Sequence, residues 1–280
     1  MSGEQVPLNG SAGNALTFTE SDSVAVDRAV DVLTSCRSLL FITGAGISAD
    51  SGLPTYRGIG GLYDVDLPED GLPIEEILSG RMIRREPELT WKYLIQIANA
   101  ARGAQPNRGH QVIAEMERHF ERVWTLTQNV DGFHRAAGTQ NLIEIHGDLH
   151  DILCTDCGWR QHVGDYDAIE FPPTCPQCRR IVRPDVVLFG ELLPPAKVQQ
   201  LFAQCRRGFD AVFSVGTSSV FPYIAEPVRQ TRMRGRPTIE INPGESAISP
   251  WIDIRLTLRA APALDAIWTR YCQRRGVNLP

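Results

Sequence analysis

Four cysteines stand at a spacing that suits a metal ion. Cys154 and Cys157 form one C-x-x-C pair, and after 17 further residues Cys175 and Cys178 form a second pair. Each pair can fold into a knuckle that presents two thiolates, and two knuckles complete a tetrahedral zinc site. Because the protein supplies all four ligands, no position remains for water, so we expect a structural zinc. Redox-active pairs or core thiols are the alternatives.

A glycine-rich turn could bind phosphate. The apolar run 39–42 predicts a buried strand, and Gly44-Ala45-Gly46-Ile47-Ser48 follows it at once. Such a turn lets backbone N–H groups approach the pyrophosphate of a dinucleotide. The pattern is not G-x-G-x-x-G, since Ala49 replaces the third glycine, and an ordinary strand-to-helix turn is the alternative. Further on, Arg57 could pair with a phosphate, or it could be an exposed arginine of a surface loop.

Polar residues mark the ends of four other predicted strands. The strands 123–128, 142–146, 211–216 and 237–242 lead, in that order, to Asn129 and Asp131, His146, Thr217 and Ser218, and Asn242. Ligands of open α/β sheets bind at the carboxyl ends of the strands. His146 is the leading candidate for a general base, because histidine titrates near neutral pH. The alternatives are a structural histidine, a helix N-cap at Thr217 and a turn-forming Asn242. We interpret the other histidines as incidental to catalysis: His110, His119, His134, His150 and His162.

The order of the predicted elements indicates a parallel sheet. Helices separate most of the strands predicted at 39–42, 123–128, 142–146, 185–190, 211–216, 237–242 and 253–258. This alternation predicts an α/β fold with a Rossmann-like, doubly wound parallel sheet. A helical insertion at 64–103 and the cysteine-bearing insertion at 148–182 would form a smaller domain. We assign 21–63, 104–147 and 183–280 to the dinucleotide-binding domain, and 1–20 to a disordered arm.

The composition excludes several classes of protein. The chain has 280 residues, of which 42% are hydrophobic and 22% charged, as in ordinary globular proteins. A net charge of −5 argues against nonspecific nucleic-acid binding, and no stretch has the apolar length needed to cross a membrane. The first 20 residues lack the basic start and apolar core of a secretory signal. Seven cysteines in such a chain do not indicate a disulfide framework. We therefore expect a cytoplasmic protein with no nucleic-acid or membrane partner.

Taken together, these segments resemble the sirtuins, the NAD-dependent protein deacylases, in their bacterial and mitochondrial branches. The resemblance covers roughly residues 38–260 and depends on the number and order of the motifs. They are Gly44-Ala45-Gly46-Ile47-Ser48, Ser51-Gly52-Leu53-Pro54-Thr55-Tyr56-Arg57, Thr127-Gln128-Asn129-Val130-Asp131 with His134 and Ala137-Gly138, His146-Gly147, the four cysteines, Pro184 with Val186-Val187-Leu188-Phe189-Gly190-Glu191, Gly216-Thr217-Ser218 and Asn242-Pro243.

The resemblance implies NAD as co-substrate, one structural zinc, and acyl-lysine proteins or peptides as partners. It implies that NAD is bound by Gly44, Ala45, Gly46, Ser48, Thr55, Tyr56, Arg57, Gln128, Asn129, Asp131, Gly216, Thr217, Ser218, Asn242 and Pro243. Val187, Phe189, Gly190 and Glu191 would line the channel for the acyl-lysine. The substrate backbone would pair as an extra strand between the loops near 187–191 and 217–222.

The resemblance also implies a reaction. The acyl carbonyl oxygen attacks the ribose C1′ as nicotinamide leaves near Ile47, Asn129 and Asp131. His146 then acts as base on a ribose hydroxyl, and the products are free lysine, nicotinamide and O-acyl-ADP-ribose. A dry pocket with positioned dipoles suits the oxocarbenium-like centre of such a reaction. His146 and Asn129 are the catalytic residues of this hypothesis.

Three other functions share parts of these patterns. An NAD-dependent dehydrogenase would share the fold, but it has no reason for an all-cysteine site beside a His-Gly strand end. A non-catalytic NAD-binding module would need neither His146 nor Asn129. A mono-ADP-ribosyltransferase, which cleaves NAD and modifies protein with ADP-ribose, is compatible with the motifs.

The acyl group is predicted to be neutral. Relatives that prefer succinyl-lysine and malonyl-lysine carry a Tyr and an Arg three residues apart on the helix before the Pro-Asn turn. An alignment without gaps on Trp91 and Pro106-Asn107 places these positions on Gln96 and Asn99. A carboxylate entering such a pocket would lose hydration without gaining an ionic partner. Lys92 and Arg102 are nearby cations that could pair with such a carboxylate if a different face of the helix pointed toward the pocket.

Overall fold

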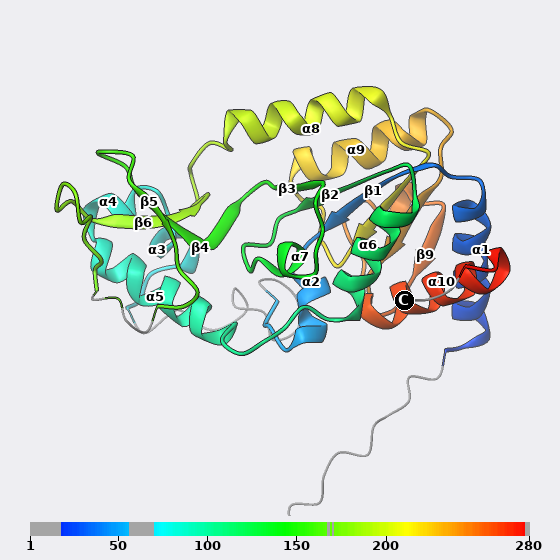
Figure 1. Cartoon of the computed structure of the whole chain (residues 1–280), viewed down its shortest axis with the longest axis horizontal. Coiled ribbons are helices and arrows are strands. Elements are labelled where there is room, and N and C mark those ends of the chain that lie inside the picture. The colour runs from blue at the N-terminus through cyan, green and yellow to red at the C-terminus, as the bar shows by residue number, and fades with distance from the viewer. Residues whose placement is uncertain (1–17, 56–69, 167–168, 170, 278–280) are drawn as a thin grey trace, which may run out of the picture.

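The larger of two lobes is built on a six-stranded parallel sheet (Figure 1). The structure is a computed structural model that describes residues 18–55, 70–166, 169 and 171–277. The strand order is β3-β2-β1-β7-β8-β9, and every pair in the sheet is parallel. The strands are β1 (Ser38–Thr43), β2 (Arg122–Thr127), β3 (Leu142–Glu144), β7 (Ala211–Val215), β8 (Thr238–Ile241) and β9 (Ile254–Leu256). The predicted doubly wound parallel sheet is confirmed.

Helices cover both faces of this sheet because each strand buries side chains on both sides. In β1, Leu39 and Phe41 belong to one apolar core, while Leu40 and Ile42 belong to another. The first core is closed by α1 (Glu20–Thr34), α6 (Arg108–His119) and α10 (Ala260–Arg275). The second is closed by α8 (Pro195–Arg207) and α9 (Pro222–Met233) on the opposite side (Figure 1). Strands buried on both faces read as continuous apolar runs, which is why the sequence revealed them.

Side-chain caps begin α1 and α6, two of the three helices that close the first core. The Thr19 hydroxyl accepts a hydrogen bond from the backbone N–H of Asp22, and the Asp22 carboxylate accepts one from the N–H of Thr19. At α6, the Asn107 side chain accepts from the N–H of Gly109 at 2.9 Å. Such caps replace hydrogen bonds that a first helical turn lacks. Both helices therefore begin at a side-chain cap, and α1 begins inside the segment 1–20 that we assigned to a disordered arm.

The smaller lobe joins both insertions into one body. Its antiparallel sheet has the order β5-β4-β6, formed by β4 (Gly147–Cys154), β5 (Arg160–His162) and β6 (Val182–Val186). Three helices pack on it: α3 (Ile74–Ile77), α4 (Met82–Arg85) and α5 (Pro87–Ala100). Trp91 of α5 is buried in the shared apolar core and donates its indole N–H to the Val182 carbonyl at 3.0 Å. The remaining short helices are α2 (Ala45–Ser48), η1 (Ala49–Ser51), α7 (Phe133–Ala136) and η2 (Ser249–Trp251).

The strand predicted at 185–190 for the large sheet is wrong. The strand found there, β6, ends at Val186 and pairs with β4 of the small sheet, where Val182 faces Cys154 and Val186 faces Gly147. Beyond β6, Phe189 donates its N–H to the Leu78 carbonyl and accepts from the N–H of Gly80. The apolar side chains of this run are buried in the small-lobe core rather than beneath α8. We therefore propose that the dinucleotide-binding domain resumes near Pro195, not at residue 183.

Within the described part of the chain, no helix combines the length and the apolar composition that are needed to cross a membrane.

Two buried histidines of the large lobe predict loss of stability in acid. His110 and His134 lie with ring centroids 4.9 Å apart, and His134 also contacts the Thr43 hydroxyl at 2.9 Å. Burial lowers the pKa of His110 to about 4 and that of His134 well below its ordinary value. Both pKa values lie below the value of about 6.5 expected in the unfolded chain, so the unfolded state binds more protons in acid. The free energy of unfolding is therefore undiminished by these two histidines above about pH 6.5, and it decreases as the pH falls toward 4.

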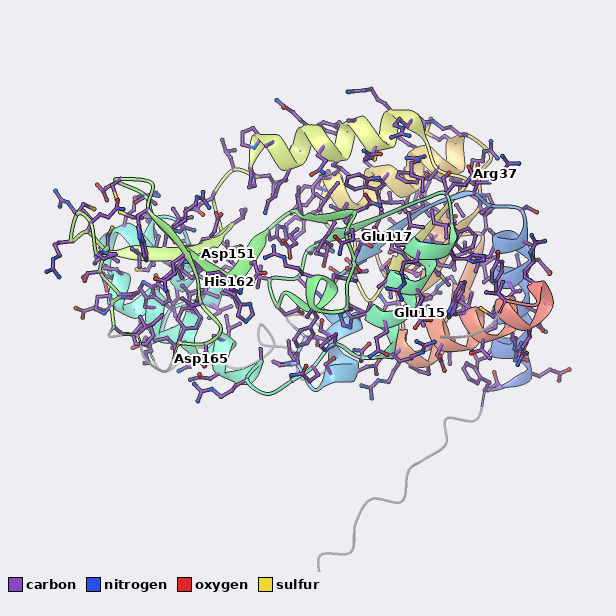
Figure 2. All side chains as sticks on the ribbon, in the orientation of Figure 1. Arg37, Glu115, Glu117, Asp151, His162 and Asp165 are labelled. Atoms are coloured by element: carbon purple, nitrogen blue, oxygen red, sulfur yellow. The ribbon has the colours of Figure 1, made fainter. Side chains whose placement is uncertain are left out.

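Urea unfolding at pH 7.5 and pH 5.0 measures this effect. Burial of His110 should lower the free energy of unfolding at pH 5.0 by about 2 kcal/mol relative to pH 7.5, and burial of His134 acts in the same direction. The difference between the two pH values should shrink in His110→Gln, whose side chain does not titrate. It should persist in the control His162→Gln, because His162 is exposed on β5, where it pairs with Asp151 (Figure 2). Equal pH dependence in His110→Gln and wild type would contradict the assignment.

Candidate functional site

The strand order of the large sheet reverses between β1 and β7. From β1 the chain proceeds to β2 and β3 on one side, and after the small lobe it continues through β7, β8 and β9 on the other side. Ligands of open α/β sheets bind outside the carboxyl ends of the strands at such a switch point. The turn of residues 44–48 follows β1, and Gly216 with Thr217 follows β7. The topology therefore places both predicted phosphate-binding turns at this point.

The two turns approach each other so closely that side chains would not fit between them. The N–H of Gly46 donates to the Gly216 carbonyl at 2.9 Å. A Cβ atom on Gly46 would lie 2.6 Å from the Gly216 Cα, and one on Gly44 would lie 2.8 Å from the Thr217 Cβ. Gly216 also has a φ of +59°, a conformation that glycine adopts without steric cost. The glycines are thus required for this backbone-on-backbone contact.

A chain of hydrogen bonds joins the predicted residues at the ends of four strands. Gln128 donates its side-chain amide to the Thr217 hydroxyl at 2.8 Å, and Asn242 donates to the Thr217 carbonyl at 3.0 Å. Asn129 donates to the Gly44 carbonyl and to the Ser48 hydroxyl, each at 3.1 Å. The residues predicted after β1, β2, β7 and β8 therefore form one polar surface.

Asp131 is half-buried at this surface. Its carboxylate accepts from the Ser48 hydroxyl at 2.6 Å and from the backbone N–H of Phe133 at 3.0 Å. Burial raises the pKa of Asp131, while these two hydrogen bonds act in the opposite direction. A carboxyl group in such surroundings can accept a hydrogen bond from the amide of a bound ligand when it is ionised, or donate one when it is protonated.

The other predicted nucleotide-binding residues lie around this surface. Ala45 and Thr55 are half-buried, whereas Ser218 and Pro243 are exposed. Tyr56 and Arg57 lie outside the described residues.

His146 connects the two lobes at the exit from β3. Its Nδ1 lies 2.9 Å from the Gln128 carbonyl oxygen, and its Nε2 lies 2.7 Å from the Tyr223 hydroxyl oxygen. A carbonyl oxygen only accepts, so Nδ1 carries the hydrogen and Nε2 is the basic atom of the neutral ring. Burial lowers the pKa of His146, against the effect of the Gln128 carbonyl. The imidazole is therefore neutral near pH 7 and able to accept a proton.

The loop after β6 is anchored to His146 and to the small lobe. The N–H of Val187 donates to the His146 carbonyl at 2.8 Å, and Phe189 packs against the small-lobe core. The Glu191 carboxylate accepts from the Arg183 guanidinium at 2.6 and 2.9 Å and from the N–H of Leu188 at 2.9 Å. Glu191 thus fixes the shape of the loop, and Gly190 is exposed at its turn with a φ of +78°.

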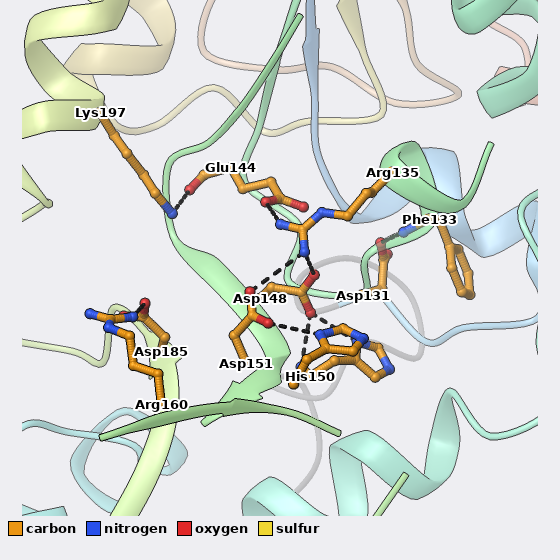
Figure 3. A network of polar contacts seen from close by, with 11 residues as sticks. Asp131, Phe133, Arg135, Glu144, Asp148, His150, Asp151, Arg160, Asp185 and Lys197 are labelled. Carbon is orange, nitrogen blue, oxygen red and sulfur yellow. Dashed lines mark hydrogen bonds and ion pairs between the residues drawn. The ribbon is translucent and has the colours of Figure 1, made fainter. Parts of the chain in front are cut away.

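A charged network at the junction of the lobes was not predicted from the sequence. Arg135 of α7 forms ion pairs with Glu144, Asp148 and Asp151, which lie on β3 and β4 (Figure 3). The His150 Nδ1 lies 2.8 Å from the Asp148 carboxylate, which raises the pKa of His150. The Arg135 contacts join α7 to strands that lie 9 to 16 residues further along the chain, whereas the Tyr223 contact with His146 spans 77 residues. No local pattern predicts either one.

The four predicted metal ligands converge in the small lobe. The sulfur atoms of Cys154, Cys157, Cys175 and Cys178 all lie within 4.8 Å of one another. Two of the sulfur–sulfur distances are 3.4 and 3.5 Å. Zinc at about 2.3 Å from four thiolates requires sulfur atoms about 3.8 Å apart. The cluster fits one zinc ion held entirely by protein, as the spacing predicted.

Known proteins show the same combination of fold and site. Residues 44–222 match the model of the Sir2 family. The chain is 49% identical over 231 residues to an NAD-dependent protein deacylase of Pseudomonas aeruginosa, covering 81% of this chain and 90% of that protein. A deacylase of Pseudomonas syringae pv. tomato is also 49% identical, over 237 residues, covering 84% and 95% of the two chains.

Solved structures agree with these relatives. A Sir2 homologue bound to ADP-ribose superposes with a TM-score of 0.82 at 33% identity, covering 91% of this chain and 99% of that one. A Sir2 homologue in complex with NAD gives a TM-score of 0.80 at 33% identity, covering 90% and 95%. The resemblance to sirtuins is confirmed, and the chain belongs to the Sir2 family.

Proposed function

We propose that this chain removes acyl groups from protein lysine side chains and transfers them to the ADP-ribose part of NAD. The chain is an NAD-dependent protein deacylase. The observation that carries the proposal is the orientation of His146, which follows β3. The Gln128 carbonyl accepts a hydrogen bond from Nδ1–H, and Nε2 is therefore the basic atom of the ring. The hydride transfer of a dehydrogenase would not require a base that acts on a ribose hydroxyl.

NAD supplies the ribose hydroxyl that accepts the acyl group. The two turns at the switch point, with Gly44, Gly46, Gly216 and Thr217, suit the pyrophosphate because their backbones are free of large side chains. Ser48 and Asn129, which are buried, and the half-buried Asp131 form a hydrogen-bonded polar cluster that suits nicotinamide. Asn242, at the end of β8, suits a ribose hydroxyl. Ala45, Thr55, Ser218 and Pro243 complete the surface around them.

The residues of this chain move one proton in the acyl transfer. His146 Nε2 takes the proton of the ribose hydroxyl, and the Gln128 carbonyl stabilises the positive charge of the protonated ring through Nδ1–H. Asn129 is held in place by the Gly44 carbonyl and the Ser48 hydroxyl, so its amide is positioned before the substrate arrives. The zinc cluster lies in the other lobe and holds that lobe together rather than taking part in the reaction.

The lysine side chain would enter beside the loop of residues 187–191. Val187 is hydrogen-bonded to His146, so a side chain that passes Val187 and Phe189 reaches the base. Leu192 and Val220 are both exposed, on the two loops that would pair with the substrate backbone. We propose acyl-lysine proteins or peptides as substrates. The four thiols of the metal cluster suit a reducing compartment such as the cytoplasm.

We also propose that the acyl group is neutral. Gln96 and Asn99 are exposed on α5, and neither carries a positive charge. The inward face of α5 carries Leu94 and Ile97, which pack in the same apolar core as Phe189. Lys92 forms an ion pair with Asp70 at 2.8 Å, and Arg102 donates to the Asn99 side chain. Both cations thus have partners of their own, and the inward face of α5 is apolar.

A panel of acyl-lysine peptides tests this preference. Acetyl-lysine should give a kcat/KM at least about 10-fold higher than succinyl-lysine, because an unpaired carboxylate entering an apolar pocket is strongly disfavoured. A succinamoyl-lysine peptide has the size of the succinyl peptide without its charge, and it should behave more like the neutral substrates. Succinyl-lysine as the best substrate of the panel would show that the pocket contains a cation.

Nicotinamide release tests the reaction class. The rate should depend on the acetyl-lysine peptide, and absorbance at the NADH wavelength should not change. Formation of NADH would indicate a dehydrogenase and contradict the proposal.

A further inference from the structure

The basic nitrogen of His146 already has a partner in this structure. Because Nδ1–H donates to the Gln128 carbonyl, Nε2 has a single lone pair, and it lies 2.7 Å from the Tyr223 hydroxyl. An oxygen and an unprotonated nitrogen at this distance form a hydrogen bond only if the hydroxyl donates. Burial raises the pKa of Tyr223 to about 12, so its hydroxyl keeps its hydrogen near neutral pH. The lone pair that would accept the substrate proton is therefore occupied.

The surrounding rings fix Tyr223 in this position. Its ring is stacked on Phe221 with a centroid distance of 5.4 Å and an interplanar angle of 12°. The His146 ring stands edge-on to both of them, at 6.1 Å from Phe221 and 6.0 Å from Tyr223. Tyr223 is in the first turn of α9, whose next residue Ile224 is fully buried. The contact is thus held by packing as well as by the hydrogen bond.

We infer that Tyr223 is a positioning residue that caps the general base and must release it before acyl transfer. This inference rests on the proposed function. A nitrogen with one lone pair cannot accept from Tyr223 and from a ribose hydroxyl at the same time with good geometry. The proton of the ribose hydroxyl can pass to Nε2 only after the Tyr223 hydroxyl has turned or moved away. Until then the Tyr223 hydroxyl satisfies Nε2, and both side chains are half-buried.

The capped state lowers the fraction of enzyme that is ready for the step that needs the base. A neutral hydrogen bond contributes a modest net free energy, which corresponds to about a 2- to 10-fold excess of the capped over the open state. A protein whose competent state is only partly populated reacts more slowly by that fraction. Tyr223→Phe keeps the stacked ring and removes only the hydroxyl, so it should leave His146 in place and open.

One reaction mixture separates this step from those before it. After nicotinamide has left, the bound species either returns to NAD by taking up nicotinamide or proceeds through His146 to O-acyl-ADP-ribose. With acetyl-lysine peptide and labelled nicotinamide, exchange of label into NAD reports the first route and O-acetyl-ADP-ribose the second. The ratio of O-acetyl-ADP-ribose formed to label exchanged into NAD is independent of the amount of folded enzyme.

Tyr223→Phe should raise this ratio by about 2- to 10-fold over wild type. The matched control is Tyr271→Phe, which removes a hydroxyl from a second tyrosine–histidine contact, 3.1 Å from His119 between α10 and α6. Its ratio should equal that of wild type. An unchanged or lower ratio in Tyr223→Phe would overturn the cap. Absence of both exchange and O-acetyl-ADP-ribose in wild type would overturn the proposed function itself, and the two failures are therefore distinguishable.

Discussion

His146→Ala should abolish deacylation while the fold and NAD binding persist. The change removes the basic nitrogen at the end of β3, which the Gln128 carbonyl directs. Loss of one general base costs about 10²–10⁴-fold in rate. Initial rates of deacetylated peptide formation at saturating NAD and peptide measure the effect on kcat. The variant should still bind NAD, and the shift in melting temperature that NAD causes measures this binding.

The control for this variant is His162→Ala. His162 is exposed on β5 and contacts Asp151, and it makes no contact with the strand ends of the large sheet among the contacts of the described residues. Its removal should leave kcat within about twofold of wild type. Near-normal turnover of His146→Ala would mean that another group is the base.

Cys175→Ser should release zinc and destabilise the small lobe. Cys175 is buried, and its sulfur lies 3.5 Å from that of Cys157 in the four-cysteine cluster. A structural zinc contributes folding free energy directly, and a serine hydroxyl does not replace a thiolate ligand. We expect the zinc content to fall from about one ion per chain to nearly none, and the melting temperature to fall by on the order of 10 °C.

Elemental analysis of the purified proteins, together with thermal unfolding, measures both effects. Cys205→Ser is the matched control, because Cys205 is a partly buried thiol of α8 outside the cluster, and burial raises its pKa to about 11. It should keep its zinc. A wild-type protein without stoichiometric zinc, or a Cys175→Ser variant as stable as wild type, would refute a structural metal site.

Local patterns predicted most of the large lobe and the metal site. The strands are continuous apolar runs because both faces of the sheet are covered, and each run ends at a glycine or a polar residue. The C-x-x-C pairs needed only two tight turns and one sheet to bring them together. At these positions the physical requirement lies within a few neighbouring residues, and the sequence therefore displays it.

Other features depend on contacts that the sequence does not display. The run from Val186 to Phe189 is as apolar as a strand of the large sheet, yet its hydrogen-bond partners are β4 and the Leu78–Gly80 turn. The choice between two sheets is made by distant partners. Tyr223 follows His146 by 77 residues, with β4, β5, β6, α8 and β7 between them, and nothing near Tyr223 in the chain indicates that its hydroxyl contacts an imidazole.

The inward face of α5 is visible in its local periodicity. Trp91, Leu94 and Ala98 recur at spacings of three and four residues, which is the period of a helix face that packs inward. That period places Gln96 and Asn99 on the exposed side of the helix, as observed. The residues of α5 that face the core could therefore be predicted from the sequence.

Mass spectrometry of the products formed from NAD and an acetyl-lysine peptide tests deacylation most directly. Acyl transfer to ADP-ribose predicts three products in equal amounts: the peptide with a free lysine, nicotinamide, and O-acetyl-ADP-ribose. The acetyl group must therefore appear on ADP-ribose rather than as free acetate. A peptide that keeps its acetyl group and gains the mass of ADP-ribose would contradict deacylation and identify the chain as an ADP-ribosyltransferase.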